Sequence, residues 1–271
     1  SIKLIKYPDK KRFINIIKKA KKYIENGDIY QVNLSHRMEI DGFFDKKSIF
    51  LNLVNYQPTP YLMLLQDIEF SIISASMELF LKKEKNILKT KPIKGTRPRG
   101  KSKKEDLNYY KELRNSEKER AENLMITDLM RNDLGIISKR VFVEKLFDIE
   151  KYKSLYQMSS TVKSILKEKI SLKDIIYSTF PPGSVTGAPK KRALEIIDQL
   201  EEHKRYVYCG SIFLIKPNKD FVMSVAIRQS IFHNNKCYIY VGAGIVADSI
   251  PEKEFKETIL KSKANIKSFK L

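Results

Sequence analysis

The sequence is poor in cysteine and has no long apolar run. Cys209 and Cys237 each stand in an apolar stretch typical of a strand, and neither has the CxxC neighbour of a metal or redox site. No stretch reaches the roughly 18 apolar residues of a membrane helix. The first residues, SIKLIKYPDKKRF, also lack the layout of a secretory signal. We therefore expect no membrane span, no export and a cytoplasmic location.

Internal repeats and linkers rich in proline, glycine or serine are absent as well. We therefore expect residues 1–271 to form a single catalytic domain. A hydrophobic content of 42% and a mean hydropathy of −0.38 exclude a disordered chain and indicate a soluble globular protein. Because the sequence begins with Ser1 rather than Met, we expect it to be a piece of a longer protein.

Basic residues are in excess. The chain has 52 Lys and Arg against 32 Asp and Glu, a net charge of +20 that attracts nucleic acid or an anionic substrate. The lysine-rich runs, such as residues 18–22 and 101–104, are short and are typical of solvated surfaces. No basic stripe alternates with aromatic residues. Nucleic-acid binding is therefore the alternative function from a different class. Because the basic stripe is missing, we expect the chain to have no nucleic acid partner.

Strand patterns and helix patterns occur in separate blocks. Four segments have helical periodicity. One begins near residue 10, one follows Pro189, and two follow the capping-box patterns at Ser116 and Ser249. Alternation or β-rich composition predicts strands over 29–40, 58–65, 68–76, 79–84, 86–92, 206–216, 221–232 and 237–246, of which the four from 58 to 92 form a meander. This grouping favours an α+β fold with antiparallel sheets.

Two predicted helices carry a Glu-x-x-Glu step, which places both carboxylates on one face. The pairs are Glu119 with Glu122 and Glu254 with Glu257. Glu122 is followed by apolar residues one and two turns later, and a carboxylate drawn toward a core needs a cation such as Mg²⁺. The alternative is that Glu119 only caps its helix and the second pair contacts solvated lysines.

The predicted strand over 221–232 places small residues and Arg228 on one face. Gly242 and Gly244 give the following strand a comparable face, and Tyr208 can do so on the preceding one. A wall of small residues with an arginine suits a carboxylate, which a guanidinium holds by two parallel hydrogen bonds. The alternative is a surface arginine beside a glycine bulge.

Two loops contain glycine. The loop PIKGTRPR places Lys94 among apolar residues, where the neutral, nucleophilic amine is favoured. The loop PPGSVTGAPK precedes a helix N-terminus, which suits an anion, but it lacks the P-loop spacing. Taken separately, either loop could equally be an ordinary turn.

These segments together resemble the chorismate-utilising enzymes, which include anthranilate synthase, aminodeoxychorismate synthase component I, isochorismate synthase and salicylate synthase. The resemblance runs from Gly27 to Lys261. Its motifs are GDIYQVNLSHR, SASMELF, PIKGTRPRG, ERAENLMITDLMRNDLG, PPGSVTGAPKKRALEIID, YCGSIFLI, SVAIRQ and GAGIVADSIPEKEFKETILK. The resemblance implies a four-layer α/β/β/α fold with two orthogonal, mostly antiparallel sheets that bind Mg²⁺ and chorismate.

The resemblance also implies a metal site and a substrate pocket. Glu122 and Glu257 would bind Mg²⁺, with Glu119 and Glu254 reaching it through water. The residues that would hold the substrate carboxylates or line the pocket are Arg228, Lys261, Tyr208, Thr186, Gly187, Gly242 and Gly244.

Further positions distinguish members of the family. Glu78 would be the general acid that helps the 4-hydroxyl leave, although Met77 replaces the usual proline before it. Isochorismate and salicylate synthases carry a lysine base where this chain has Gln31, a substrate-binding position. Lys94 is typical of the aminodeoxychorismate synthases, and Gln157 stands where many relatives have a histidine linked to pyruvate elimination.

From this resemblance we expect a Mg²⁺-dependent enzyme that aminates chorismate at C4 to 4-amino-4-deoxychorismate, for para-aminobenzoate and folate synthesis. The resemblance also implies that its ammonia comes from a glutamine amidotransferase subunit, and the chain shows no Cys/His/Glu triad pattern of its own. The alternative within the family is anthranilate synthase component I.

Overall fold

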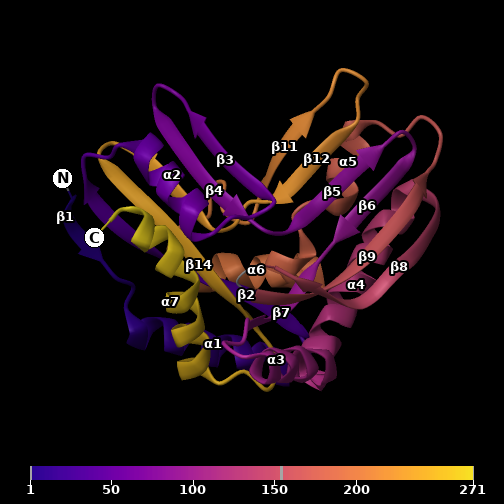
Figure 1. The fold of residues 1–271 in the computed structure, drawn as a ribbon. Helices are drawn as coiled ribbons and strands as arrows, with labels where there is room; N and C mark the ends of the chain where they lie inside the picture. The colour runs from indigo at the N-terminus through magenta and orange to yellow at the C-terminus, as the bar shows by residue number, and fades with distance from the viewer. Residues whose placement is uncertain (1, 153–154, 271) are drawn as a thin grey trace. The chain divides into compact units, whose positions relative to one another are not determined.

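The computed structural model describes residues 2–152 and 155–270, which form two compact units. Unit 1 consists of residues 2–77, 185–211 and 225–270, and unit 2 of residues 78–184 and 212–224. Each unit contains one seven-stranded sheet with helices packed on it (Figure 1). The expectation of a single catalytic domain stays a prediction.

The unit 1 sheet is antiparallel throughout. Its order is β1 (Ile2–Lys6), β2 (Gln31–Gly42), β14 (Lys236–Ile245), β13 (Gln229–His233), β4 (Phe70–Ser76) and β3 (Tyr61–Gln66), and β10 (Gly187–Ala188) also pairs with β2. The helices of this unit are α1 (Lys10–Glu25), α2 (Lys46–Tyr56), α6 (Lys190–Leu200) and α7 (Pro251–Ser268).

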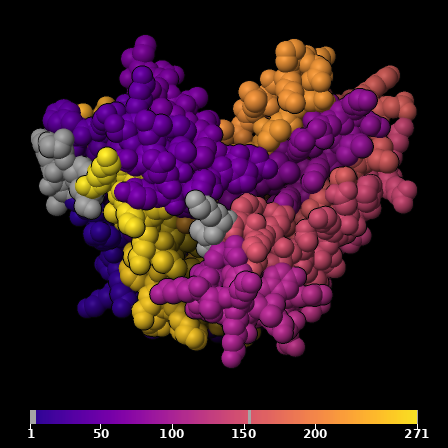
Figure 2. All heavy atoms as spheres, viewed as in Figure 1, coloured from indigo at the N-terminus to yellow at the C-terminus, as the bar shows by residue number. Residues whose placement is uncertain are grey.

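All four helices bury their apolar residues against the unit 1 sheet. Phe13 of α1 and Ile196 of α6 pack on β2 and β14, while Leu53 of α2 packs with β4, β13 and β14. Helix α7 adds Ile259 to this second cluster and lies against α1 and α2, so that the end of the chain meets its beginning (Figure 2). Burial of these side chains stabilises the sheet from its helix-covered face.

The unit 2 sheet follows the order β11 (Ser211–Ile215), β12 (Phe221–Val225), β5 (Leu79–Glu84), β6 (Ile87–Lys91), β9 (Leu155–Leu166) and β7 (Ile93–Pro98), with β8 (Ser138–Lys151) also on β9. The pairs from β12 to β8 are antiparallel. The helices of this unit are α3 (Lys103–Asn115), α4 (Glu117–Ile137) and α5 (Leu172–Thr179), followed by the short 3₁₀ helix η1 (Gly183–Val185).

Two antiparallel sheets with covering helices confirm the expected α+β class, and α1, α4, α6 and α7 begin and end near the predicted residues. The predicted meander over 58–92 is wrong, because β3 and β4 belong to one sheet and β5 and β6 to the other. Within residues 2–152 and 155–270, no helix is long and apolar enough to cross a membrane.

The continuous strand predicted over 221–232 is also wrong. Its two halves, β12 and β13, lie in different sheets, and the chain turns between them at Arg228, whose φ is +55°. Likewise the segment before β11 is not extended, because Tyr206 and Cys209 have φ values of +48° and +65°. Cys209 therefore lies outside any strand, whereas Cys237 lies in β14 as expected.

The predicted capping boxes form only in part. Ser116 accepts a hydrogen bond from the Glu119 backbone N–H at 3.3 Å, but its own N–H donates to the carbonyl of Leu113. Ser249 does not cap α7: that helix begins at Pro251 after Ile250, and the Ser249 hydroxyl accepts instead from the N–H of Val246.

Candidate active site

The face of the unit 1 sheet turned away from its helices is polar and small. The residues of β2 and β14 that join the hydrophobic core alternate with Gln31, Asn33, Ser35, Gly242 and Gly244, which face the other way. Gly242 pairs with Ser35, and Gly244 with Asn33, so these positions form one continuous surface. A flat surface of this kind leaves room for a ligand.

Tyr208 closes one side of this surface. Its ring stacks on that of Tyr240 with centroids 5.3 Å apart, and burial raises its pKa well above the usual value, so the phenol stays a neutral donor. A Cβ atom added at Gly242 would lie 2.9 Å from the Tyr208 hydroxyl and 2.9 Å from the carbonyl oxygen of Leu34. Position 242 therefore requires glycine.

Arg228 and Lys261 form a cationic corner beside Gly242. The Arg228 guanidinium donates to the Lys261 carbonyl at 2.7 Å. The Lys261 ammonium donates to the Gly242 carbonyl at 3.0 Å and pairs with Glu257 at 2.7 Å. Burial lowers the pKa of Arg228, as expected for a cation in a poorly hydrated place. Such a corner suits a carboxylate ligand.

The predicted face of small residues leading to Arg228 is not formed, because the strand breaks before that residue. Instead α7 holds Arg228 in its left-handed backbone conformation: Asn265 donates from Nδ2 to the Arg228 carbonyl at 3.3 Å and to Ser230 Oγ at 3.1 Å. The alternative of a surface arginine is not borne out either, since Arg228 is half-buried and bonded to Lys261.

Thr186 and Gly187 lie directly on β2. The Thr186 carbonyl accepts from the Asn33 N–H at 2.8 Å. Gly187 has a φ of +143°, and a Cβ there would stand only 2.2 Å from the Gln31 carbonyl oxygen. Gln31 is fully buried, and within the described residues neither polar atom of its side chain has a hydrogen-bond partner. The structure thus gathers the predicted substrate-binding residues of unit 1 around β2 and β14.

A buried ion pair, missed by the sequence reasoning, anchors this loop. Arg205 donates to the carbonyls of Val185 at 3.0 Å and Asn33 at 2.6 Å, and its charge is balanced by Glu201 at 2.6 Å. Glu201 also accepts from the N–H of Ser35 at 2.6 Å. The Glu201 side chain is 2% exposed, so the pair holds the Thr186 loop against β2 from a dry environment.

Glu119 approaches the strand that carries Lys94, within unit 2. Lys94 lies in β7 and is half-buried. The adjacent Gly95 has a φ of +85°, and a Cβ there would lie 2.9 Å from Glu119 Oε2. Arg97, two residues further along β7, pairs with Glu119 at 3.3 Å and with Glu112 at 2.8 Å. Glu119 is therefore more than a helix cap, because its carboxylate lies over the strand that carries Lys94.

The other carboxylates predicted to act are largely buried. The Glu122 side chain is 14% exposed, Glu78 before β5 is 6% exposed, and Glu254 on α7 is 6% exposed. Glu257 fits the alternative of a solvated pair better, since it is 52% exposed and contacts Lys261. A buried carboxylate must be paired with another group or bound to a metal ion.

The four glutamates fit a magnesium ion in donor chemistry, since carboxylate oxygens are the ligands that this hard cation takes. Glu119 and Glu122 belong to α4 of unit 2, and Glu254 and Glu257 to α7 of unit 1. Among the residues that the structure describes, no three or more His, Cys, Asp or Glu side chains form a metal-binding group. The Mg²⁺ ligands stay a prediction.

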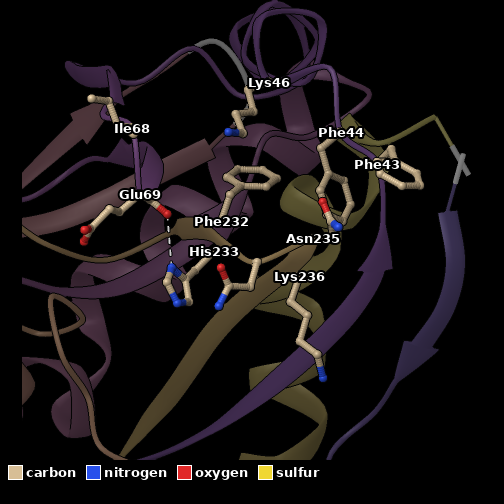
Figure 3. A pocket seen from close by; sticks show the side chains of 10 residues that line it. Phe43, Phe44, Lys46, Ile68, Glu69, Phe232, His233, Asn235 and Lys236 are labelled. Atoms are coloured by element: carbon tan, nitrogen blue, oxygen red, sulfur yellow. Dashed lines mark hydrogen bonds between the residues drawn. The ribbon is translucent and has the colours of Figure 1, made fainter.

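A surface cavity of about 660 Å³ lies elsewhere in unit 1 and contains none of the predicted site residues (Figure 3). The turns after β2, β3 and β13 surround it, and two of its lining residues are neighbours, with His233 Nδ1 3.1 Å from the Glu69 carbonyl oxygen. Its mixed lining of phenylalanines, lysines and turn asparagines brings together no set of catalytic groups.

Comparisons with known proteins identify the family of the chain. A family model described as chorismate binding enzyme matches residues 2–267. The chain is 40% identical over 264 residues to anthranilate synthase component 1 of Aquifex aeolicus, covering 97% of this chain and 53% of that protein. It is also 40% identical over 261 residues to aminodeoxychorismate synthase component 1 of Bacillus subtilis, covering 96% and 56%.

Among solved structures, the fold resembles anthranilate synthase component I from Streptococcus pneumoniae with a TM-score of 0.89 and 34% identity, over 98% of this chain and 60% of that one. The putative 2,3-dihydroxybenzoate-specific isochorismate synthase of Bacillus anthracis gives a TM-score of 0.87 at 25% identity, over 100% and 75%. The chain spans about half the length of the curated relatives that it matches.

Proposed function

Because the chain belongs to the chorismate binding enzyme family, we propose that it aminates chorismate at C4 with ammonia, giving 4-amino-4-deoxychorismate for para-aminobenzoate and folate synthesis. The observation that carries the proposal is Lys94 itself, a half-buried lysine of β7, the strand that Glu119 approaches at Gly95. Relatives of both kinds, aminodeoxychorismate and anthranilate synthases, are equally similar in sequence, so the proposal rests on Lys94, which the family resemblance links to the aminodeoxychorismate synthases.

The residues of unit 1 suit the binding of a dicarboxylate. Arg228 and Lys261 supply two cations at one corner, and Tyr208 supplies a neutral hydroxyl donor next to Gly242. Gln31 offers a buried amide with unused hydrogen-bonding capacity in the described part of the chain. These groups orient the substrate and exclude water from it. Glu122 and Glu257, with Glu119 and Glu254 behind them, would hold Mg²⁺, which neutralises substrate carboxylate charge when bound.

In the proposed reaction the Lys94 amine forms a bond to C2 of the ring while the C4–O bond breaks. Glu78 protonates the departing hydroxyl, which leaves as water, and then takes a proton from the alkylated lysine nitrogen. Ammonia next bonds to C4, the bond from Lys94 to C2 breaks, and the protonated Glu78 returns a proton to the leaving lysine. The new ammonium group at C4 then gives one proton to Glu78, which restores the acid for the next turnover. The net change replaces the 4-hydroxyl by an amino group and releases water.

A glutamine amidotransferase subunit would supply the ammonia. Both cysteines are buried, Cys209 beside Tyr208 and Cys237 in the core cluster that α7 contacts, so neither is placed to serve as a glutaminase nucleophile. Free ammonia can replace that subunit in a test. Anthranilate synthase component I remains the second candidate, favoured by the fold likeness to the Streptococcus pneumoniae enzyme.

The test is mass-spectrometric product analysis after incubating the protein with chorismate, Mg²⁺ and an ammonium salt at mildly alkaline pH. We expect aminodeoxychorismate, and we expect Lys94→Ala to lose nearly all turnover because the covalent bond to C2 cannot form. Lys89→Ala is the matched control, since Lys89 is a half-buried lysine of β6 in the same sheet. Anthranilate as the product, or full activity in Lys94→Ala, would contradict the proposal.

A further inference from the structure

Gln229 is a second buried amide on the ligand-facing side of the unit 1 sheet. Its exposure is 0%, and neither Oε1 nor Nε2 finds a hydrogen-bond partner within the described residues. A buried amide without partners carries a desolvation cost that no hydrogen bond offsets. A side chain held at that cost is better explained by a ligand that completes its hydrogen bonds than by packing.

The position of Gln229 links it to the cationic corner. It directly follows Arg228 and is the first residue of β13. The next residue, Ser230, bonds Asn265 of α7, so alternation turns Gln229 away from the helices. Gln229 therefore shares the polar face that carries Gly242.

Register places Gln229 close to the stacked rings of Tyr208 and Tyr240. Ser230 pairs with Ile239 of β14, so Gln229 falls in the same cross-strand row as Tyr240, two residues along β14 from Gly242. Tyr240 is the ring on which Tyr208 stacks. The amide of Gln229 thus lies among the groups that hold the substrate in the proposed function.

We propose that Gln229 is a further substrate-binding residue, which recognises a hydroxyl or amino substituent on the ring of a dicarboxylate. A carboxamide both donates and accepts, whereas Arg228 and Lys261 only donate. It therefore matches a group that does both, such as the 4-hydroxyl that the reaction replaces or the 4-amino group that it installs. The inference rests on the proposed function for the identity of the ligand.

The test measures chorismate binding to the full chain by calorimetry in the presence of Mg²⁺. Gln229→Leu keeps the approximate size of the side chain and removes its hydrogen bonds, and should weaken chorismate binding about tenfold to a hundredfold. Gln66→Leu, at an exposed position of β3 in the same sheet, is the matched control and should bind as the wild type does.

The ligand-free unfolding midpoint separates binding from a structural role. Removing an unpartnered buried amide should leave the midpoint of Gln229→Leu unchanged or raise it. Wild-type chorismate affinity in that variant, or a lower midpoint with unchanged affinity, would overturn the inference alone. If Gln229→Leu fails to fold, Gln229→Glu serves, because an added anion should weaken dicarboxylate binding at least as strongly. A wild-type protein that binds no chorismate would overturn the proposed function together with this inference.

Discussion

His36 is a histidine held neutral inside unit 1. It is 6% exposed, its Nε2 lies 2.6 Å from Thr258 Oγ1, and its ring meets that of Phe13 edge to face at 4.5 Å. Burial, and then the nearby His203, lower its pKa from the ordinary 6.5 to about 3. The side chain thus ties β2 to α1 and α7 as a neutral group, which makes the fold sensitive to acid.

We expect the free energy of unfolding to fall as the pH drops from 6.5 toward 3, because the unfolded chain binds a proton at His36 and the folded chain does not. The contribution is fully present above pH 6.5 and its slope is at most about 1.4 kcal/mol per pH unit. Urea unfolding between pH 4 and pH 7.5 measures it. The decline should be shallower in His36→Gln and unchanged in His233→Gln, an exposed control. Equal pH profiles for wild type and His36→Gln would show that this histidine does not titrate as described.

At the scale of elements, the contact between α6 and β2 depends on the buried pair of Glu201 and Arg205. Glu201 follows the last residue of α6, and Arg205 spans from it to the carbonyls of Val185 and Asn33. Removing one partner leaves the other charge buried without compensation.

Glu201→Ala should therefore lower the free energy of unfolding by about 3–5 kcal/mol. The double variant Glu201→Ala/Arg205→Met should recover part of this loss, because it removes both charges. Glu202→Ala is the matched control: Glu202 pairs with Arg12 in an exposed position, so its loss should cost less than about 1 kcal/mol. Urea unfolding of the four proteins gives the comparison, and similar losses in Glu201→Ala and Glu202→Ala would contradict the assignment.

The elements that sequence patterns predicted best are those whose cause is local. Helical spacing predicted α1, whose Asp9 caps it from the preceding residue. Sequence patterns did not predict how the strands divide between the two sheets. The hydrophobic pattern from 221 to 232 is continuous, whereas the chain turns at Arg228 and the two halves join different sheets. Sequence patterns did not predict β1, β8, β9, β10, α2, α3, α5 and η1, and the segment expected to be a loop around Lys94 is strand β7.

For the site, too, sequence patterns found residues in local motifs and missed those that act through contacts distant in sequence. Lys94 and the four paired glutamates were singled out by sequence patterns and received their roles through the family resemblance. The structure places Glu119 at Gly95, next to Lys94 in the chain, without testing these roles. Arg205 and Asn265 escaped notice because their contacts join residues far apart in sequence, such as Arg205 with Asn33. For Gln229, the motif SVAIRQ contained a signal, since a polar residue directly after the pocket arginine stands out in an apolar run.

At the scale of the whole molecule, both units are discontinuous in sequence. Strand β12 returns from unit 1 to pair with β5, where Phe221 lies opposite Lys83 and Met223 opposite Leu81. The residues 78–184 alone would therefore expose one edge of β5 and lose the burial of Phe221 and Met223.

We expect a fragment of residues 78–184 to aggregate or to unfold without a sharp transition. The same fragment with residues 212–224 joined through a short flexible linker should regain a cooperative transition, because β5 recovers its partner. Urea unfolding followed by circular dichroism, with sedimentation to detect aggregates, makes the comparison. A monomeric and cooperatively folded 78–184 fragment would contradict this view of unit 2.

The net charge of +20 is also a property of the whole molecule. Two of its lysine-rich runs lie in α1 and at the start of α3, which are elements of different units. The nucleic-acid alternative rests on this charge alone, whereas the proposed function also uses the cations as fixed groups, Arg228 and Lys261, bonded to each other and to Gly242.

The packing of α7 against α1 and α2 has a consequence for how the protein is made. A chain still emerging from the ribosome has β13 and β14 before it has Lys261 and Asn265, so Arg228 then lacks both of its α7 partners. The cationic corner can be completed only when translation has passed residue 265. A nascent chain, or one cut short by a late stop codon, is therefore expected to bind the proposed substrate weakly. Incomplete copies of the protein are thus expected to be inactive.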